Sequence, residues 1–406
     1  MPTSGVKASS VKRLARRIEN VFDSFDGNTS KTFSRGYIWQ TVRVKRGPEK
    51  GSGDGLMVKG IRALARHLDV SIGTVSKALN NRSDINPETR KRVLEAAAEL
   101  GYVANQSGRS LRRGSTQTIG FMIESGNETV TDADNFFMAV FDGAQTVFRR
   151  HHLDLIVLPC ASDEDPVEYL QRTMARGLVD AVIISATRRD DARVPLLAKA
   201  ELPFVALGRS DTVSHPSIEL DFEGVAKQSV DRLVAHGHRE IAVALPANEL
   251  NMGNLFSAGY KEALRKHGIR YRRDMVRRVV ASDQGGYDLG EWLVTHPEPR
   301  PTAVVLSYEL PATGLYRRLG ESRLLPGRDI AVIGFRDSPL TRYLVPSLTS
   351  FTTSLKDLGT ALAKMLLSQM PEYRHDYRDL PNSMVWPLSL VAGRSDAFTL
   401  KSKAHR

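Results

Sequence analysis

The chain has 406 residues and a formal net charge of +11, and 41% of its residues are hydrophobic. This length exceeds what one ordinary core supports, so two or three domains are expected. The single cysteine, Cys160, excludes an intramolecular disulfide and a cysteine-rich zinc site. No apolar run is long enough to span a membrane, and the first thirty residues lack the apolar core of a secretory signal. We therefore expect a cytoplasmic protein with no membrane partner.

The positive charge is concentrated at the N-terminal end of the chain. Residues 1–56 and residues 57–116 each carry 11 Lys and Arg against 5 Asp and Glu, whereas the remaining 290 residues carry 35 against 36. A basic front joined to a neutral body is typical of a nucleic-acid-binding segment that carries a separate module.

Residues 1–56 show little periodicity and are rich in Gly, Ser, Thr and basic residues. We predict that this extension is mostly disordered. Two interpretations remain open: translation starts at Met57 and the extension is a mis-assigned start, or the extension is a basic arm that touches phosphates.

The segment Ile61 to Asn80 has the spacing of two short helices joined by a turn. Ile61, Leu64, Ala65 and Leu68 fall on one helical face, and Ser71 is a suitable N-cap for a second helix. The outward face of that second helix consists of small, polar or basic residues, namely Ile72, Gly73, Ser76 and Lys77. Such a face suits a helix that enters the DNA major groove, because it can approach base edges without repelling phosphates.

A third helix is predicted after Asn86, with Pro87 in its first turn and Gly101 at its end. Two amphipathic helices alone also fit a generic helical bundle. The strings TVSKALN and NPETRKRVLEAAAELGYVAN are more specific, because they resemble the N-terminal headpiece of the lactose-repressor (LacI/GalR) family from about Ile61 to Leu111.

This resemblance implies a helix-turn-helix DNA-binding headpiece over residues 57–103 in a homodimeric transcription factor. Its partner would be double-stranded operator DNA with a nearly palindromic sequence, one half-site for each headpiece. The family's base-reading positions correspond here to Ile72, Gly73 and Lys77. The positions that orient the helix or touch phosphate correspond to Thr74, Ser76 and Asn80.

Residues 104–116 form a short, basic and polar segment with a lone apolar residue, Leu111. Taken alone, the segment is a linker. The resemblance implies instead a hinge that folds on DNA, in which Leu111 wedges into the minor groove and Arg112 and Arg113 hold flanking phosphates. Gly108 stands where relatives commonly have Ala, which weakens helix propensity by about 1 kcal/mol.

From Thr118 onward, continuous apolar runs alternate with amphipathic segments, which predicts an α/β core with parallel, doubly wound sheets. The pattern restarts after residues 217–221, so we expect two lobes and a cleft between them at the carboxyl ends of the strands. The resemblance implies a periplasmic-binding-protein-like core over residues 117–406, in which the chain crosses between lobes three times.

We place the three crossings near Asp221, near Thr349–Thr352 and near Leu380. The first lobe is then predicted at about 118–221 and 352–380, and the second at about 222–351 and 381–395. This core would bind the effector and form the dimer.

The effector site is predicted from the resemblance, residue by residue. Phe136 and Phe137 occupy positions that stack on ligand rings in relatives. Where sugar-binding members have an Arg that grips hydroxyls, this chain has Phe256. Arg336 replaces an Asp, although a one-residue shift could restore the acid with Asp337. The predicted effector-contacting residues are Phe136, Phe137, Asp221, Phe256, Ser307 and Arg336.

An arginine in the cleft favours a carboxylate or phosphate. We therefore expect a small carbohydrate-derived effector that is acidic or phosphorylated, or a larger glycoside stacked on Phe256.

Catalytic motifs such as GxSxG, the P-loop, HExxH and GxGxxG do not occur in a suitable context. We predict no enzymatic activity, no metal and no cofactor. The predicted function is a sequence-specific transcriptional regulator, a repressor, controlled by the effector. The alternative is a solute-binding protein of the periplasmic type that does not bind DNA, and the missing export signal together with the intact headpiece disfavours it.

Overall fold

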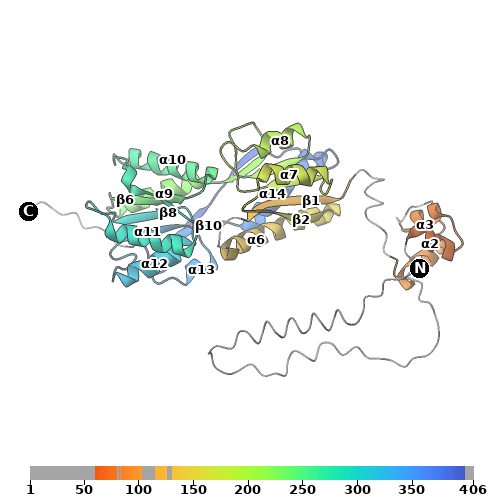
Figure 1. Ribbon diagram of the computed structural model, residues 1–406, viewed down its shortest axis with the longest axis horizontal. Coiled ribbons are helices and arrows are strands. Elements are labelled where there is room, and N and C mark those ends of the chain that lie inside the picture. Colours follow the sequence, from red (N-terminus) through yellow and green to blue (C-terminus); the bar gives the residue numbers. More distant parts are fainter. Residues whose placement is uncertain (1–59, 80–81, 83, 103–114, 126–129, 398–406) are drawn as a thin grey trace, which may run out of the picture. The chain divides into compact units, whose positions relative to one another are not determined.

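The structure is a computed structural model that describes residues 60–79, 82, 84–102, 115–125 and 130–397 (Figure 1). The chain forms two compact units, residues 1–104 and residues 105–406. The predicted extension 1–56, Asn80, Leu111, Arg112 and Arg113 lie outside the described residues. Within the described part of the chain, no helix combines the length and the apolar character needed to cross a membrane.

The described part of the first unit contains three helices, α2 (Ile61–His67), α3 (Ile72–Leu79) and α4 (Pro87–Glu99). Their inward faces form one small core, as the apolar spacing predicts. The buried members of this core are Leu64, Ala65, Val75, Ala78, Val93, Ala96 and Ala97.

Local sequence signals set the ends of these helices. The Ser71 hydroxyl accepts a hydrogen bond from the Thr74 backbone N–H at 3.0 Å, and the Asn86 side chain accepts one from the Glu88 N–H at 2.8 Å. Both contacts satisfy donors that the first turn of a helix leaves unpaired. Gly101 has φ +60°, a left-handed conformation that suits glycine after a helix. The predicted caps are therefore confirmed.

The first lobe of the second unit is built on a six-stranded sheet in the order β11-β5-β4-β3-β1-β2, with every strand parallel to its neighbours. Its strands are β1 (Thr118–Ser125), β2 (Asp154–Ala161), β3 (Ala181–Ile184), β4 (Phe204–Leu207), β5 (Ser217–Leu220) and β11 (Ser383–Trp386). Its helices are α6 (Val130–Phe148), α7 (Pro166–Ala175), α8 (Arg193–Lys199) and α14 (Leu355–Gln369), with the short turns η2 (Arg149–His151) and η4 (Arg374–Asp376).

The second lobe repeats this plan with the order β12-β10-β9-β8-β6-β7. Its strands are β6 (Ile241–Pro246), β7 (Val276–Val279), β8 (Ala303–Leu306), β9 (Ala331–Arg336), β10 (Thr349–Thr352) and β12 (Ser389–Val391). Its helices are α9 (Phe222–Ala235), α10 (Asn251–Lys266), α11 (Asp283–Thr295), α12 (Pro311–Glu321) and α13 (Pro339–Arg342), with the turn η3 (Arg273–Met275). β12 pairs antiparallel with β10, and the other pairs are parallel.

Helices cover both faces of each sheet, which explains why the strands are apolar on both sides. In the first lobe, α6 and α14 pack on one face and α7 and α8 on the other. In the second lobe, α9 and α10 cover one face and α11 and α12 the other (Figure 1). The predicted pair of doubly wound α/β lobes is confirmed.

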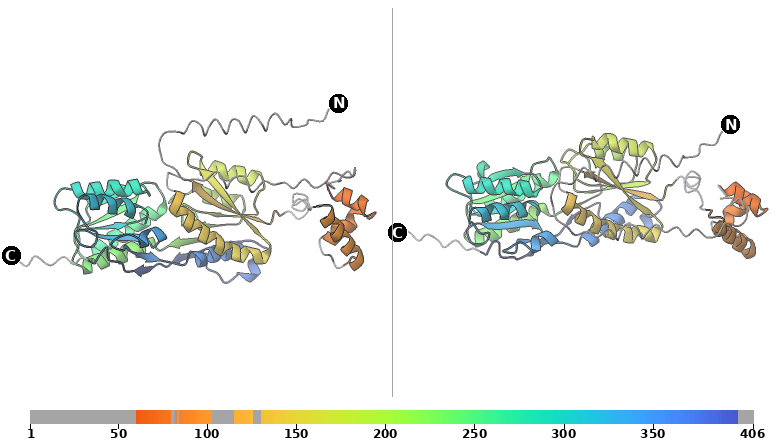
Figure 2. Two further views of the ribbon diagram at one scale, coloured as in Figure 1. Left: turned by 90° about the horizontal axis from the view of Figure 1, so that it is seen from below. Right: turned by 60° about the horizontal axis from the view of Figure 1, so that its bottom comes forward.

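The chain passes between the two lobes three times, and Figure 2 shows the connecting segments. The first passage follows β5 at Asp221, and the second follows β10, both close to the predicted places. The place that we predict for the third passage, near Leu380, is wrong. Residues Ser383–Trp386 still pair with β5 in the first sheet, and the passage comes between Trp386 and Ser389. The segment around Leu380 leads into one more strand of the first lobe and is not a boundary.

Residues 115–117, the first described residues of the second unit, are fixed to the first lobe through one side chain. The Asp180 carboxylate accepts hydrogen bonds from the Ser115 hydroxyl, the Thr116 N–H and hydroxyl, and the Gln117 N–H at 2.7 to 2.9 Å. Asp180 lies just before β3, and its own N–H donates to the Thr118 carbonyl at 2.8 Å. The chain therefore enters the core at a tightly held point.

Candidate functional sites

The outward face of α3 has the character that the sequence predicts. Ile72, Gly73 and Lys77 are exposed, and Ile72 exposes 40% of its surface. Ser76 is half-buried, and the Thr74 hydroxyl lies 2.9 Å from the Ser71 hydroxyl. An atom added at the Cβ position of Gly73 would have only the Ser71 hydroxyl oxygen near it, at 3.5 Å. The face is thus small and open around Gly73, which lets another molecule approach the helix backbone closely.

Lys77 has a partner that sequence reasoning missed. Its Nζ lies 2.7 Å from an Asp84 carboxylate oxygen in the turn before α4, and this contact holds the pKa of Asp84 below its usual value. Both side chains are more than half exposed, at 53% and 57%. An exposed pair of this kind is weak and screened by salt. Lys77 can therefore exchange Asp84 for another acceptor.

The second unit holds a cavity of about 540 Å³ whose lining comes from both lobes. The first lobe contributes residues at the ends of β1, β3, β4 and β5, and the second contributes residues at the ends of β6, β7, β8 and β9. This is the place where ligands bind in open α/β sheets, at the carboxyl ends of parallel strands. The volume falls within the range of small-molecule sites.

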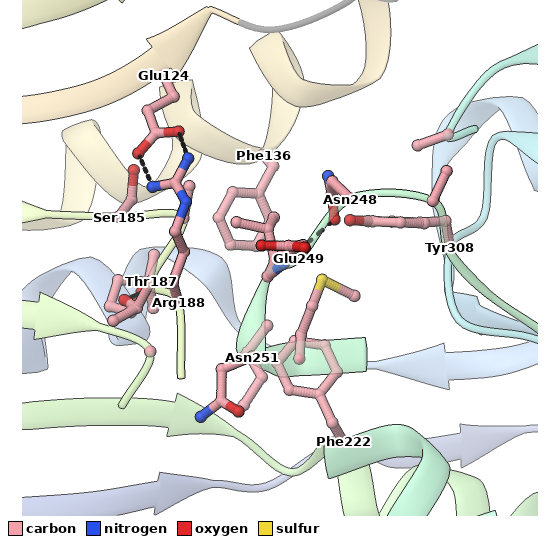
Figure 3. A pocket seen from close by; sticks show the side chains of 18 of the residues that line it. Glu124, Phe136, Ser185, Thr187, Arg188, Phe222, Asn248, Glu249, Asn251 and Tyr308 are labelled. Carbon is pink, nitrogen blue, oxygen red and sulfur yellow. Dashed lines mark hydrogen bonds and ion pairs between the residues drawn. The ribbon is translucent and has the colours of Figure 1, made fainter. Parts of the chain in front are cut away.

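Aromatic side chains line the cavity from both lobes (Figure 3). Phe136 and Phe137 come from α6, and Phe222 stacks on Phe335 with ring centroids 5.0 Å apart. Tyr308 follows β8, and burial raises the pKa of its hydroxyl to about 12. Phe136 and Phe137 thus lie where the resemblance placed them, and Phe222, Tyr308 and Phe335 extend the apolar lining.

Two contacts join the lobes beside this cavity. The Asn251 backbone N–H donates to the Thr187 carbonyl and its side-chain amide donates to the Arg209 carbonyl, each at 2.9 Å. Asn251 begins α10 in the second lobe, whereas Thr187 and Arg209 follow β3 and β4 in the first. Asn251 is 4% exposed. The lobes therefore meet through main-chain acceptors at the edge of the cavity.

The cations of the cavity are already paired. Arg188 binds both oxygens of Glu124, at 2.9 and 2.7 Å, and Figure 3 shows this double contact. Arg336 forms an ion pair with Glu309, and its guanidinium also lies 5.5 Å from the ring centroid of Phe136. Arg336 does line the cavity, as predicted, but Glu309 offsets its charge. The expectation that Arg336 makes the cavity favour an anion is therefore corrected.

Three other predicted effector residues do not line the cavity. Phe256 is fully buried in the core face of α10 and meets the ring of Phe335 edge to face at 6.3 Å. Asp221 caps α9 by accepting the Gly224 N–H at 2.8 Å. Ser307 is 2% exposed, and its N–H donates to the Ala244 carbonyl. The prediction that Phe256 offers a stacking surface to the effector is wrong, because the ring packs inward behind Phe335.

The one-residue shift that would restore an acid does not occur. Asp337 pairs with Arg342 at 2.8 Å and is not part of the lining.

Sequence reasoning missed several lining residues. Glu219 is the clearest, because it lies within the buried strand β5 and is 7% exposed. Its carboxylate accepts the Arg209 N–H at 2.9 Å, and burial raises the pKa of this carboxyl to about 7. A charged residue inside an otherwise apolar strand was a usable signal. Glu124 near the end of β1, Arg188 after β3 and Asn251 at the start of α10 belong to no recognisable motif.

Comparisons with known proteins agree with this geometry. Residues 61–105 match the family model for bacterial regulatory proteins of the lacI family, and residues 230–395 match a periplasmic binding protein-like domain. The HTH-type transcriptional regulator AglR of Rhizobium meliloti (strain 1021) is 30% identical over 347 residues, covering 84% of this chain and 94% of the relative. Catabolite control protein A of Priestia megaterium is 27% identical over 310 residues, covering 76% and 91%.

Among solved structures, the lac repressor dimer bound to operator and the anti-inducer ONPF superposes with a TM-score of 0.72 at 23% identity, covering 83% of this chain and 99% of that one. The transcriptional regulator CelR–cellobiose complex gives a TM-score of 0.61 at 24% identity, covering 83% and 99%. These two likenesses concern the fold.

A helix-turn-helix unit joined to a two-lobed periplasmic-binding-protein-like core defines a DNA-binding transcriptional regulator. The chain belongs to the LacI family of bacterial regulatory proteins. The alternative of a solute-binding protein without DNA binding is thereby set aside.

Proposed function

We propose that this regulator is a homodimeric cytoplasmic repressor, without enzymatic activity, that binds a nearly palindromic operator. One α3 helix would read each half-site through Ile72, Gly73 and Lys77, while Thr74, Ser76 and Asn80 orient the helix on the backbone. The exposed, acid-free outer face of α3 carries this proposal.

The hinge completes the proposed DNA contact. Leu111, in the segment 104–116, would enter the minor groove at the operator centre, with Arg112 and Arg113 on the phosphates. An apolar wedge of this kind unstacks one base step and kinks the duplex.

The cavity between the lobes is the proposed effector site, and its proposed occupant is carbohydrate-derived. The solved CelR complex contains cellobiose, and the aromatic lining of the present cavity suits the apolar face of a sugar ring. An effector would act by binding one arrangement of the lobes more tightly than another, and so would shift the population of the DNA-competent state.

Homodimer formation is supported by exposed apolar side chains in the second lobe. Tyr343 and Val345 each expose 86% of their surface, and Leu340 exposes 43%. The three residues lie close together in the sequence, on α13 and directly after it, and exposed apolar side chains that gather on a surface are typical of an interaction site.

Selection of binding sites from random duplex DNA with the full chain tests the proposed function. We expect an enriched sequence with two inverted half-sites. Light scattering of the complex is expected to give one dimer per duplex. Enrichment of no sequence, or of a single half-site bound by a monomer, would contradict the proposal.

A further inference from the structure

The charges that line the effector cavity are unequal in number. Among the described lining residues the cations are Arg188 and Arg336, and the acids are Glu124, Glu164, Glu219, Glu249 and Glu309. The cavity therefore contains more acid than base.

Ion pairs offset three of the five acids. Arg188 holds Glu124, Arg336 holds Glu309, and Arg172, outside the lining, holds Glu164. Arg336 and Glu309 are buried, with side-chain exposures of 8% and 11%. Arg193, which is 1% exposed, adds a second contact to Glu124 at 3.0 Å. These pairs fix the orientation of both lining arginines.

Glu219 and Glu249 form no ion pair with any cation in the described part of the chain. Glu219 is buried, and its carboxylate accepts one hydrogen bond, from the Arg209 backbone N–H. The Arg209 guanidinium itself lies 3.5 Å from the Glu223 carboxylate. Glu249 is exposed at the turn before α10. Each lobe therefore offers the cavity one carboxylate, Glu219 from the first and Glu249 from the second, with remaining capacity to accept hydrogen bonds.

An anionic ligand would meet two difficulties in this cavity. It would face Glu219 and Glu249, and it could gain a cation only by taking Arg188 or Arg336 from its carboxylate. Taking Arg336 would leave Glu309 as an uncompensated buried charge, which is costly. Arg188 is 38% exposed, and without it Glu124 would keep its contact with Arg193, so the cost there is smaller. A ligand rich in neutral hydroxyls meets neither difficulty, because its O–H groups donate to free carboxylate oxygens.

We propose that the effector is an uncharged, polyhydroxylated glycoside, and that Glu219 is the residue that selects it by accepting its hydroxyl hydrogens. The inference rests on the proposed function, in that it takes this cavity as the effector site. The apolar faces of the sugar lie against Phe136, Phe222 and Tyr308, which point into the cavity in Figure 3. Glu249 provides a second acceptor at the rim.

Glu219 also makes the binding depend on pH. The charged groups near it are Arg209 after β4 and Glu223 on α9, and Arg188, Glu249 and Glu309 share the cavity. Because burial raises the pKa of Glu219 to about 7, its carboxyl gains charge as the pH rises through neutrality. The ionised form accepts hydroxyl hydrogens more strongly. The affinity for a neutral glycoside therefore rises from pH 6 to pH 8.

Calorimetry of the full chain provides the test, with maltose, cellobiose, trehalose and raffinose as neutral probes and glucose 6-phosphate, gluconate and glucuronate as anionic ones. We expect at least one neutral probe to bind and no anionic probe to bind. In Glu219→Gln the affinity for that neutral probe falls on the order of tenfold, and its rise with pH disappears. Glu223→Gln is the matched control, since Glu223 carries the same charge near Arg209 but does not line the cavity.

Tight binding of an anionic probe, binding of no neutral probe, or equal affinities of wild type and Glu219→Gln would overturn the assignment. Gel shifts with the selected operator, without any sugar, are run on the same proteins. If the chain binds its operator and also binds glucose 6-phosphate, the proposed function stands and this inference is overturned. If the chain binds no operator, the proposed function is overturned, whatever the calorimetry shows.

Discussion

The indole N–H of Trp386 donates a hydrogen bond to the Thr353 hydroxyl oxygen at 2.8 Å. Trp386 ends β11 and Thr353 follows β10, so this contact joins two of the three passages between the lobes. The Thr353 hydroxyl in turn donates to the Pro387 carbonyl at 3.1 Å, and the Asp221 N–H donates to the Trp386 carbonyl at 3.0 Å. The three connecting segments are thus tied to one another and must bend together.

Trp386→Phe removes the indole donor and keeps an aromatic ring, so we expect the free energy of unfolding to fall by about 1 kcal/mol. Thr353→Val should cost a similar amount, and the double variant should cost less than the sum, since both changes break the same bond. Chemical denaturation of the four proteins measures this. Full additivity would show that the two side chains do not interact. Small-angle scattering is expected to show a broader distribution of lobe separations in each variant.

Lys77→Ala is expected to weaken operator binding roughly ten- to hundredfold and to relax the preference at one base pair, because the lysine donates to base acceptors in the major groove. Binding-site selection with both proteins measures this. Asp84→Asn is the control, since it removes the partner of Lys77 but keeps the lysine charge. It should leave the base preference unchanged. Identical preferences for wild type and Lys77→Ala would remove Lys77 from the reading surface.

Leu111→Ala is expected to reduce DNA bending and operator affinity while the core keeps its fold and its effector affinity, because the wedge is removed. Gel-shift assays with a bending probe give the bend angle for each protein. Equal angles would favour a plain linker.

In the same assays, a basic arm in residues 1–56 would be visible as salt dependence: its deletion should flatten the slope of log K against log salt by roughly 0.9 for each phosphate that the arm neutralises.

Glu219→Gln is expected to stabilise the folded chain at alkaline pH. The pKa of Glu219 is raised to about 7 by burial, so the folded state binds its proton more tightly than the unfolded state does. The native state is therefore favoured below the ordinary carboxyl pKa, and this advantage is lost as the pH rises to about 7 and above. At pH 8 the variant should be more stable by roughly 1–3 kcal/mol, with little difference at pH 4.5. A series of denaturation experiments across this pH range measures the difference. An equal effect of the substitution at pH 4.5 and at pH 8 would contradict the prediction.

Val345→Asp is expected to weaken dimer formation at least tenfold, because it places a charge in the exposed apolar group around Tyr343. Sedimentation equilibrium measures the change. Leu325→Asp, at another exposed apolar site in the second lobe, is a suitable comparison. A loss of dimer with both variants would indicate general destabilisation and not a specific surface.

Much of the fold could be predicted because buried parallel strands leave an apolar signature, as in the runs around Ile183 and Val305. The last part of the chain was harder, since β11 and β12 are short and mostly exposed edge strands with little periodicity. Their placement depends on long-range pairing with β5 and β10.

The position of Phe136 in the sequence was enough to place it among the residues that line the cavity, and its role in binding an effector stays a prediction. The contacts of a side chain could not be predicted where they depend on a neighbour far away in the sequence. Nothing local indicates that Glu309 neutralises Arg336, or that Phe335 covers Phe256. Both outcomes depend on contacts that β9 makes with other elements, with Glu309 after β8 and with Phe256 on α10, and a single sequence does not display them.

The Asp180 carboxylate mounts the beginning of the core on the first lobe alone. Four hydrogen bonds from residues 115–117 end on this side chain, which makes the attachment stiff. Residues 115–117 therefore move with the first lobe, and the second lobe affects them only through the first. If an effector acts through the proposed cavity, only a movement that reorients the first lobe, which holds Asp180, would reach residues 115–117 through these four bonds.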